Sequence, residues 1–250
     1  MSSSTQTGWP RGVFSVFPTI LLAAGAVAIA FLALLVFFAL AIKSGHMDPH
    51  HPRRISVMVQ LLAELAIYLP VGTYLLILLP RLAKRSLGEL GLRPPGWREI
   101  GIGLAGAILM TLVVNSLGAL MLALTHRHDT EAAIALLKQI KTPGEKYVFV
   151  AIATALAPML EELGFRVFLF NAFARYAPVP LAIFLSGAIF GLVHSAALPQ
   201  LLTIAIPLAS GGMVLALIYV WSRNYWSSVI THALFNAIPL TLYFVFHIKT

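Results

Sequence analysis

Two adjacent carboxylates and a guanidinium lie inside one apolar stretch, as Glu161, Glu162 and Arg166 within residues 147–173. Each ionisable side chain near the centre of a bilayer costs roughly 2.5 to 3.5 kcal/mol, so three in one helix require partners, water or a function. Glu162 and Arg166 are four residues apart and suit an ion pair on one helix face, whereas Glu161 points about 100° away. The pattern predicts one neutralised carboxylate and one left free for acid or base chemistry.

Two further polar patterns with helical spacing lie in later apolar stretches. Phe190 and His194 are four residues apart near the end of one stretch, and His232 and Asn236 are four apart in the last. Residues at this spacing share a helix face, so the imidazole and amide of the last pair can converge on a common pocket. The patterns supply, in order, a carboxylate, an imidazole, and an imidazole with an amide.

The composition fixes the setting of these groups. The chain has 250 residues, of which 59% are hydrophobic and only 10% charged, and its mean hydropathy is +0.89, which excludes a soluble domain. It contains no cysteine, which excludes disulfides, thiolate metal sites and cysteine nucleophiles. The net charge of +8 comes from Lys and Arg in loops and at helix ends, where anionic lipid rather than nucleic acid is the expected partner.

Seven apolar segments predict seven membrane crossings. They cover residues 18–42, 55–79 (ended by Pro80), 100–124, 147–173, 178–197, 201–221 and 226–248. An eighth helix, short and lying on the membrane surface, is predicted within residues 130–140. The expected fold is all-α, a polytopic transmembrane helix bundle that encloses a polar site. It forms one integral membrane domain over residues 1–250, with a motif-bearing core at about 147–248. The basic segment 81–98 is expected on the cytoplasmic side.

Taken in order, the three patterns resemble the EExxxR, FxxxH and HxxxN motifs of the CPBP intramembrane endopeptidases. This family groups the CAAX prenyl proteases with bacterial bacteriocin-processing and immunity proteins. Residues 87–92 and 211–226 resemble the same family, and the motifs cover about residues 155–240. The resemblance implies a glutamate-dependent membrane hydrolase of the bacterial inner (cytoplasmic) membrane, which cleaves a membrane-associated peptide or protein.

The resemblance and the needs of amide hydrolysis together give each motif residue an expected role. The residues expected to act on the substrate are Glu161, His194, His232 and Asn236. Glu161 would be the general base that activates a water, and His194 would help to hold or deprotonate the same water. His232 and Asn236 would stabilise the oxyanion. A structural role, fixing the first motif helix, is expected for Glu162 and Arg166.

Zinc and aspartyl mechanisms are the alternatives for hydrolysis. No cofactor is expected, but a zinc mechanism stays open because Glu161, His194 and His232 are acceptable zinc ligands. An aspartyl mechanism is excluded because the two aspartates, Asp48 and Asp129, fall in loops.

Several other polar residues have a simpler interpretation. Ser186 and Ser210 precede glycines and are interpreted as helix-packing residues rather than nucleophiles. A histidine cluster between the first two spans, interpreted as a solvated turn rather than a metal site, consists of His46, His50 and His51.

Two other functions use the same groups. The first is a non-catalytic scaffold or immunity protein that binds a peptide or a membrane partner in the same pocket. The second is a proton-coupled transporter, which is disfavoured because the polar groups lie almost wholly in the second half of the chain.

Glu64, one helical turn from Gln60 in the second span, fits either a packing role or a position in the cavity wall.

Overall fold

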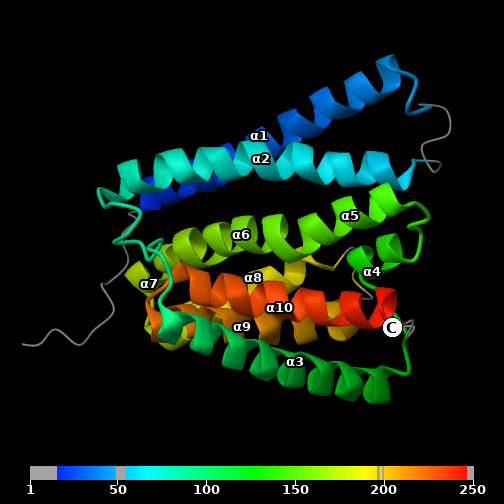
Figure 1. The fold of residues 1–250 in the computed structure, drawn as a ribbon. Coiled ribbons are helices and arrows are strands. Elements are labelled where there is room, and N and C mark those ends of the chain that lie inside the picture. Colours follow the sequence, from blue (N-terminus) through cyan, green and yellow to red (C-terminus); the bar gives the residue numbers. More distant parts are fainter. Residues whose placement is uncertain (1–15, 49–54, 196–197, 199, 247–250) are drawn as a thin grey trace, which may run out of the picture.

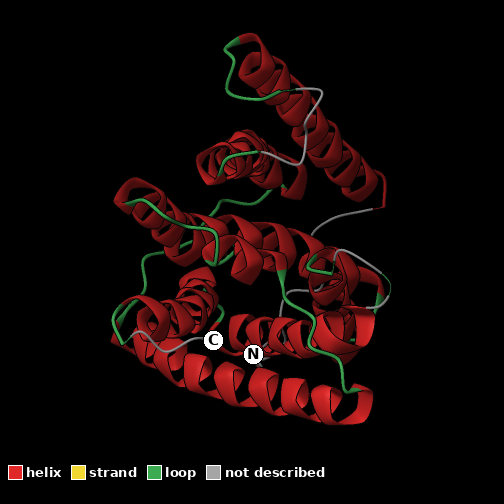
Figure 2. Cartoon of the chain, turned by 90° about the vertical axis from the view of Figure 1, so that its right-hand side faces the viewer, coloured by secondary structure: helices red, strands yellow, loops and turns green. Residues whose placement is uncertain are grey.

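The computed structural model describes residues 16–48, 55–195, 198 and 200–246 of the chain. Within these residues all regular structure is helical, as Figure 2 shows. His50 and His51 of the predicted histidine turn lie outside the described residues, and so does Ala197, the predicted end of the fifth span.

In the described part of the chain, seven long helical rods alternate in direction (Figure 1). Three are single helices near the amino terminus: α1 (Val16–Lys43), α2 (Val57–Ala83) and α3 (Trp97–Thr125). The fourth contains α-helical and π-helical (η) parts: α5 (Pro143–Ala151), η2 (Ile152–Leu156), α6 (Ala157–Glu162), η3 (Leu163–Phe170) and α7 (Asn171–Tyr176). The last three are α8 (Val179–Val193), η4 (Leu201–Ala205) continued by α9 (Ile206–Ser222), and α10 (Tyr225–Phe244).

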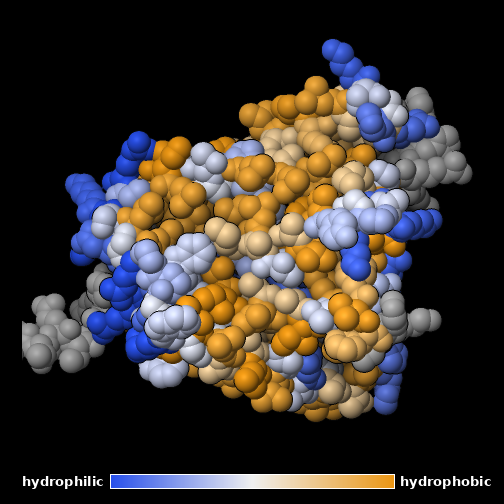
Figure 3. All heavy atoms as spheres, viewed as in Figure 1, coloured by the Kyte–Doolittle hydropathy of each residue, from blue (hydrophilic) through white to orange (hydrophobic). Residues whose placement is uncertain are grey.

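The lengths and composition of these rods fit a membrane. Among the described residues, 5 helices are long and apolar enough to cross a bilayer, and α8 is a shorter apolar helix. The space-filling view shows apolar side chains across the middle of the molecule and hydrophilic ones toward its two ends (Figure 3). These features confirm the predicted all-α polytopic bundle of an integral membrane protein.

The predicted surface helix is present as α4 (Ala132–Leu137). It is more closely packed than the prediction states, because Leu136 and Leu137 are buried among apolar side chains of α2, α5 and α10. The segment between α3 and α5 is therefore fixed against the bundle.

The rods form two groups (Figure 1). Helices α1 and α2 pack against each other as a hairpin on one side of the molecule. On the other side, α3, α8, α9 and α10 pack together, with α10 against α3 and α8 against α9. The α5–α7 rod lies between the two groups, and α2 is the part of the hairpin that contacts it.

Helix α2 does not stop at Pro80, so that prediction was wrong. The helix continues to Ala83, and Pro70 also lies inside it. A proline disturbs the turn that precedes it, by losing one N–H and by ring crowding, but the residues after it can still continue the helix, often with a kink. The helix ends instead at Lys84, whose left-handed backbone (φ 51°) lets its N–H reach the carbonyls of Pro80 and Arg81.

Two of the π-helical segments have the same local cause. Both η2 and η4 are 5 residues long, and each is followed by a proline in the first turn of the next α-helix, Pro158 or Pro207. Proline lacks an N–H and its ring crowds the preceding turn, so the helix widens locally before it. The third segment, η3, begins directly after Glu162. The two carboxylates of the first motif thus lie on a short α-helix between two π segments, a backbone form that recurs at functional sites.

Close packing of α8 against α9 depends on glycine. A Cβ at Gly191 would collide with the backbone of the η4–α9 rod, namely the carbonyl oxygen of Ala205 and, at 2.6 Å, the nitrogen of Ala209. A Cβ at Gly187 would likewise lie 2.7 Å from the nitrogen of Met213. This close approach sets the depth of α8 in the bundle, and α8 carries His194 at its carboxyl end.

We expect Gly191→Ala to destabilise the protein by about 1–3 kcal/mol, because backbone atoms cannot move aside as a flexible side chain can. Thermal unfolding in detergent micelles would measure this loss as a lower Tm. The control is Gly118→Ala in α3, where a Cβ would meet nothing within 4 Å and where the better helix propensity of alanine applies. Equal Tm values for the two variants would contradict this account of α8 packing.

Candidate active site

The three polar patterns of the sequence meet inside the bundle. Helix α6 supplies Glu161, the end of α8 supplies His194, and α10 supplies His232. The Oε2 atom of Glu161 lies 3.8 Å from Nε2 of His194 and 3.9 Å from Nε2 of His232. These distances are too long for direct hydrogen bonds, but a polar atom among the three groups could contact all of them.

Partners at Nδ1 orient both imidazole rings. Nδ1 of His194 lies 2.7 Å from the carbonyl oxygen of Phe190, and Nδ1 of His232 lies 3.0 Å from Oε1 of Glu162. An acceptor at Nδ1 requires the proton on that nitrogen, which leaves Nε2 to face Glu161. The His194 ring also packs on the ring of Phe190, with 4.5 Å between centroids. Phe190 therefore holds His194 both by its ring and by its carbonyl group.

Glu162 joins two of the motifs. Its Oε2 lies 3.0 Å from Nε of Arg166, and its Oε1 accepts from His232. The Glu162 and Arg166 side chains are 0% exposed. The predicted ion pair is thus present, and the sequence did not indicate that the same carboxylate also binds the histidine of α10.

Arg166 has few hydrogen bonds for a buried cation. Its Nη2 donates to the carbonyl of Gly212 in α9 at 3.1 Å, whereas its Nε contacts Glu162 without hydrogen-bond alignment. Nη1 has no hydrogen-bond partner among the residues that the structure describes. The guanidinium instead lies over the ring of Phe190, 4.9 Å from its centroid, and that of Phe165, at 5.7 Å. Charge pairing and cation–π contact therefore carry most of its stabilisation.

Asn236 lies one turn beyond His232 but has a backbone partner. Its Nδ2 donates to the carbonyl of Ala153 in η2 at 2.8 Å. A π-helical segment shifts the usual pattern of carbonyl partners, and the amide satisfies one of these carbonyls. One N–H of the Asn236 amide remains for another acceptor.

Tyr68 of α2 is a site residue that the sequence analysis missed. Its hydroxyl donates to Oε1 of Glu161 at 2.7 Å, across the contact between the hairpin and the α5–α7 rod. Tyr68 lies four residues after Glu64 and eight after Gln60, so the three share one face of α2. That spacing was a readable signal, and it favours the cavity wall for Glu64.

Glu131 is the second missed residue. It precedes α4 and lies within electrostatic range of His194, Glu161 and His232. Burial is the largest effect and raises the pKa of Glu131; His194 lowers this pKa, Glu161 raises it and His232 lowers it. Glu131 lies in a polar loop, far in the sequence from the three motifs, and has no sequence signal of its own.

A neighbouring aspartate ties the same loop to the bundle. Oδ2 of Asp129 accepts from Oγ1 of Thr203 in η4 at 2.7 Å and from Nε of Arg127 at 3.1 Å. The hydrogen bond from Arg127, followed by that from Thr203, lowers the pKa of Asp129. The contact with Thr203 holds the loop against η4.

The hydroxyl groups of the two candidate serines both donate hydrogen bonds to backbone carbonyls, as expected of helix-packing residues. Oγ of Ser186 donates to the carbonyl of Phe165 at 3.1 Å, and Oγ of Ser210 donates to that of Pro207 at 2.6 Å. Among the described residues, no group of three or more His, Asp or Glu side chains is arranged to hold a metal ion.

Comparison with known proteins gives a family match. Residues 143–238 match the model of the family described as type II CAAX prenyl endopeptidase Rce1-like. The match confirms the resemblance predicted from the motifs, and it supports a membrane protease at the level of the family. No curated protein and no solved structure matches the chain. The matched residues include all three motifs.

We expect Arg166→Met to lower the free energy of unfolding by about 3–5 kcal/mol, because it leaves the Glu162 carboxylate buried without its cation. The double variant Glu162→Gln/Arg166→Met should lose less than the sum of the two single variants, because neither charge then remains. Arg85→Met is the control, since Arg85 and Glu89 form an exposed ion pair with the same spacing, worth at most about 0.5 kcal/mol. Chemical unfolding in micelles measures all four variants, and additive losses would refute the coupling.

The raised pKa of Glu131 predicts a pH-dependent stability. Because the folded state holds this proton more tightly, stability falls as pH rises above the unfolded pKa of about 4.3. Glu131→Gln should therefore raise Tm at pH 7 relative to the unsubstituted protein, and the difference should vanish near pH 4. Hydrogen bonds from Ser86 lower the pKa of the exposed Glu89, so Glu89→Gln should lower Tm at pH 7 instead. Thermal unfolding across this pH range would contradict the assignment if both variants changed Tm in the same direction.

Proposed function

We propose that the protein is an intramembrane endopeptidase, in which water activated by Glu161 hydrolyses a peptide bond of a membrane-associated peptide or protein. The observation that carries the proposal is the arrangement of Oε2 of Glu161 opposite the Nε2 atoms of His194 and His232, at 3.8 and 3.9 Å. The family match at residues 143–238 supports the same reaction class.

In the proposed reaction, a water binds at Oε2 of Glu161 with Nε2 of His194 as its second contact. Glu161 takes one proton from the water while the oxygen bonds to the carbonyl carbon of the substrate. The tetrahedral intermediate then collapses, the carbon–nitrogen bond breaks, and the proton held by Glu161 passes to the leaving nitrogen. Glu161 returns to its starting charge, so it serves first as base and then as acid.

Two groups on α10 would stabilise the negative oxygen of the intermediate. His232 in its doubly protonated form presents Nε2–H to the site, and the carboxylate of Glu162 at Nδ1 balances the charge of the ring. Asn236 would contribute the N–H that is not bound to Ala153. A donor of this kind is worth roughly 3–4 kcal/mol in the transition state because the site excludes bulk water.

The proposal needs no cofactor. Zinc is the alternative, because Glu161, His194 and His232 are residue types that bind it, although the described side chains are not arranged to hold a metal ion. A bound zinc would supply the activated water itself. The proposed location is the bacterial inner (cytoplasmic) membrane, with the lipid bilayer and a membrane-associated substrate as partners.

We expect Glu161→Gln to lose more than about 100-fold in peptide cleavage while its Tm stays near that of the unsubstituted protein, because the amide cannot accept the proton. Purified variants would be incubated with quenched peptides and a membrane-protein extract, with and without a chelator, and new termini read by mass spectrometry. Glu89→Gln, an exposed carboxylate in a loop, is the control and should cleave normally.

Four outcomes decide among the mechanisms. New termini that need Glu161 and survive the chelator support the glutamate mechanism, and termini lost with the chelator support zinc. Cleavage by Glu161→Gln at the normal rate would refute the assignment of the base. No new termini from either the unsubstituted protein or Glu161→Gln would point to a binding or immunity role, for which crosslinking to a partner is the next test.

A further inference from the structure

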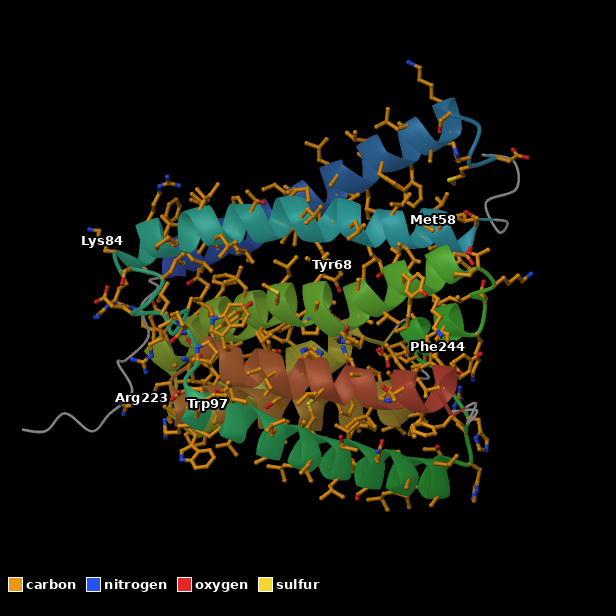
Figure 4. All side chains as sticks on the ribbon, viewed as in Figure 1. Met58, Tyr68, Lys84, Trp97, Arg223 and Phe244 are labelled. Atoms are coloured by element: carbon orange, nitrogen blue, oxygen red, sulfur yellow. The ribbon has the colours of Figure 1, made fainter. Side chains whose placement is uncertain are left out.

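Tyr68 of α2 links the α1–α2 hairpin to the candidate active site by a side-chain hydrogen bond. Its side chain lies between α2 and the α5–α7 rod (Figure 4), and its hydroxyl donates to Oε1 of Glu161 at 2.7 Å. Tyr68 and Glu161 are each only partly buried, but the hydroxyl and the carboxylate meet inside the contact between the two groups of helices. The hydrogen bond therefore reaches the general base from the side opposite the two histidines.

This hydrogen bond distinguishes the two oxygens of Glu161. Oε1 faces the phenol of Tyr68, whereas Oε2 faces the imidazoles of His194 and His232. The terminal torsion of a glutamate is broad and nearly two-fold, so a carboxylate without such a partner rotates easily. A hydroxyl that donates to a carboxylate forms one of the stronger hydrogen bonds in proteins, and low local dielectric strengthens it further.

We propose that Tyr68 is a positioning residue for the general base, fixing Oε1 of Glu161 so that Oε2 is held toward the water site between His194 and His232. This proposal rests on the proposed function of Glu161. Tyr68 acts through Glu161 and does not touch the substrate. The hairpin is thereby part of the catalytic apparatus, although the three motifs all lie on other helices.

A purely structural role for Tyr68 makes a different prediction. If the hydroxyl only joined α2 to α6, its loss would loosen the hairpin and change stability or substrate binding. If it orients the base, its loss slows the chemical step while the bound substrate is unaffected.

Tyr74 offers a matched control on the same helix. Its hydroxyl also donates across a helix contact, to the carbonyl of Leu21 in α1 at 3.2 Å. Tyr68→Phe and Tyr74→Phe thus each remove one hydroxyl and one interhelical hydrogen bond from α2. Only the first removes a partner of Glu161.

The first experiment compares kcat and KM of these variants on a peptide that the unsubstituted protein cleaves. We expect Tyr68→Phe to lower kcat by about 10- to 100-fold, with KM within about two-fold, as for a displaced catalytic group. Tyr74→Phe should keep both constants within about two-fold. A kcat of Tyr68→Phe near that of the unsubstituted protein, or a rise in KM alone, would overturn the proposal.

A second experiment observes the carboxyl group without substrate. The infrared difference between the unsubstituted protein and Glu161→Gln isolates the bands of the Glu161 side chain, and the same difference is recorded in the Tyr68→Phe and Tyr74→Phe backgrounds. We expect the Glu161 band to move in Tyr68→Phe and to stay in Tyr74→Phe. A fall in kcat without a moved band overturns the proposal, because Tyr68 would then act by another route.

The two proposals fail in different ways. If the unsubstituted protein cleaves peptides through Glu161 and Tyr68→Phe keeps its kcat, the positioning role is refuted and the peptidase function stands. If no cleavage depends on Glu161, the proposed function is refuted and the positioning role falls with it, whatever the infrared bands show.

Discussion

The site depends on one carboxylate that is removed from solvent. Glu162 is 0% exposed, and a charge so placed is tolerated only when cations or donors surround it. Its two oxygens contact Arg166 on its own helical rod and His232 on α10, and Arg166 in turn donates to the backbone of α9. Three parts of the bundle are thereby held around one negative charge. Packing alone gives no such selectivity in lipid, where helix surfaces and the surrounding medium are equally apolar.

The backbone of the α5–α7 rod lets adjacent carboxylates serve different partners. The π segments η2 and η3 flank the short helix α6, and the first of them is explained by Pro158. Glu162 contacts Arg166 and His232, whereas Glu161 faces Tyr68 and the Nε2 atoms of His194 and His232. The widened turns also leave carbonyl groups that need other donors. Asn236 satisfies one at Ala153, and Asn171 donates to those of Arg166 and Val167.

The sequence predicted contacts between residues close together in the chain, and it missed contacts between residues far apart. Residues four apart on one helix are predictable partners, which is why the ion pair of Glu162 and Arg166 and the place of His194 near a helix end were read correctly. The bundle itself followed from composition and the length of the apolar segments. Tyr68 and Glu131 were missed because their partners are distant in sequence, and the one local signal, the shared helix face of Gln60, Glu64 and Tyr68, does not name Glu161 as the partner. The end of α2 was misplaced because a proline disturbs the turn before it and need not end the helix after it.

The contrast between the two glutamates is the strongest argument for which one reacts. They have the same side chain and are consecutive in sequence, so their difference comes wholly from their surroundings. Glu162 has a guanidinium and an imidazole at 3.0 Å, and a carboxylate between two such cationic or donor groups gains little by taking a proton from water. Glu161 is 15% exposed, receives one neutral hydroxyl at Oε1, and keeps its other oxygen opposite two ring nitrogens at distances that leave room for a reactant. A buried, paired charge is suited to holding the bundle, and a partly exposed carboxylate with one oriented oxygen is suited to moving a proton. The same physical constraint, the cost of charge inside a membrane, thus separates the structural glutamate from the one that we propose to react.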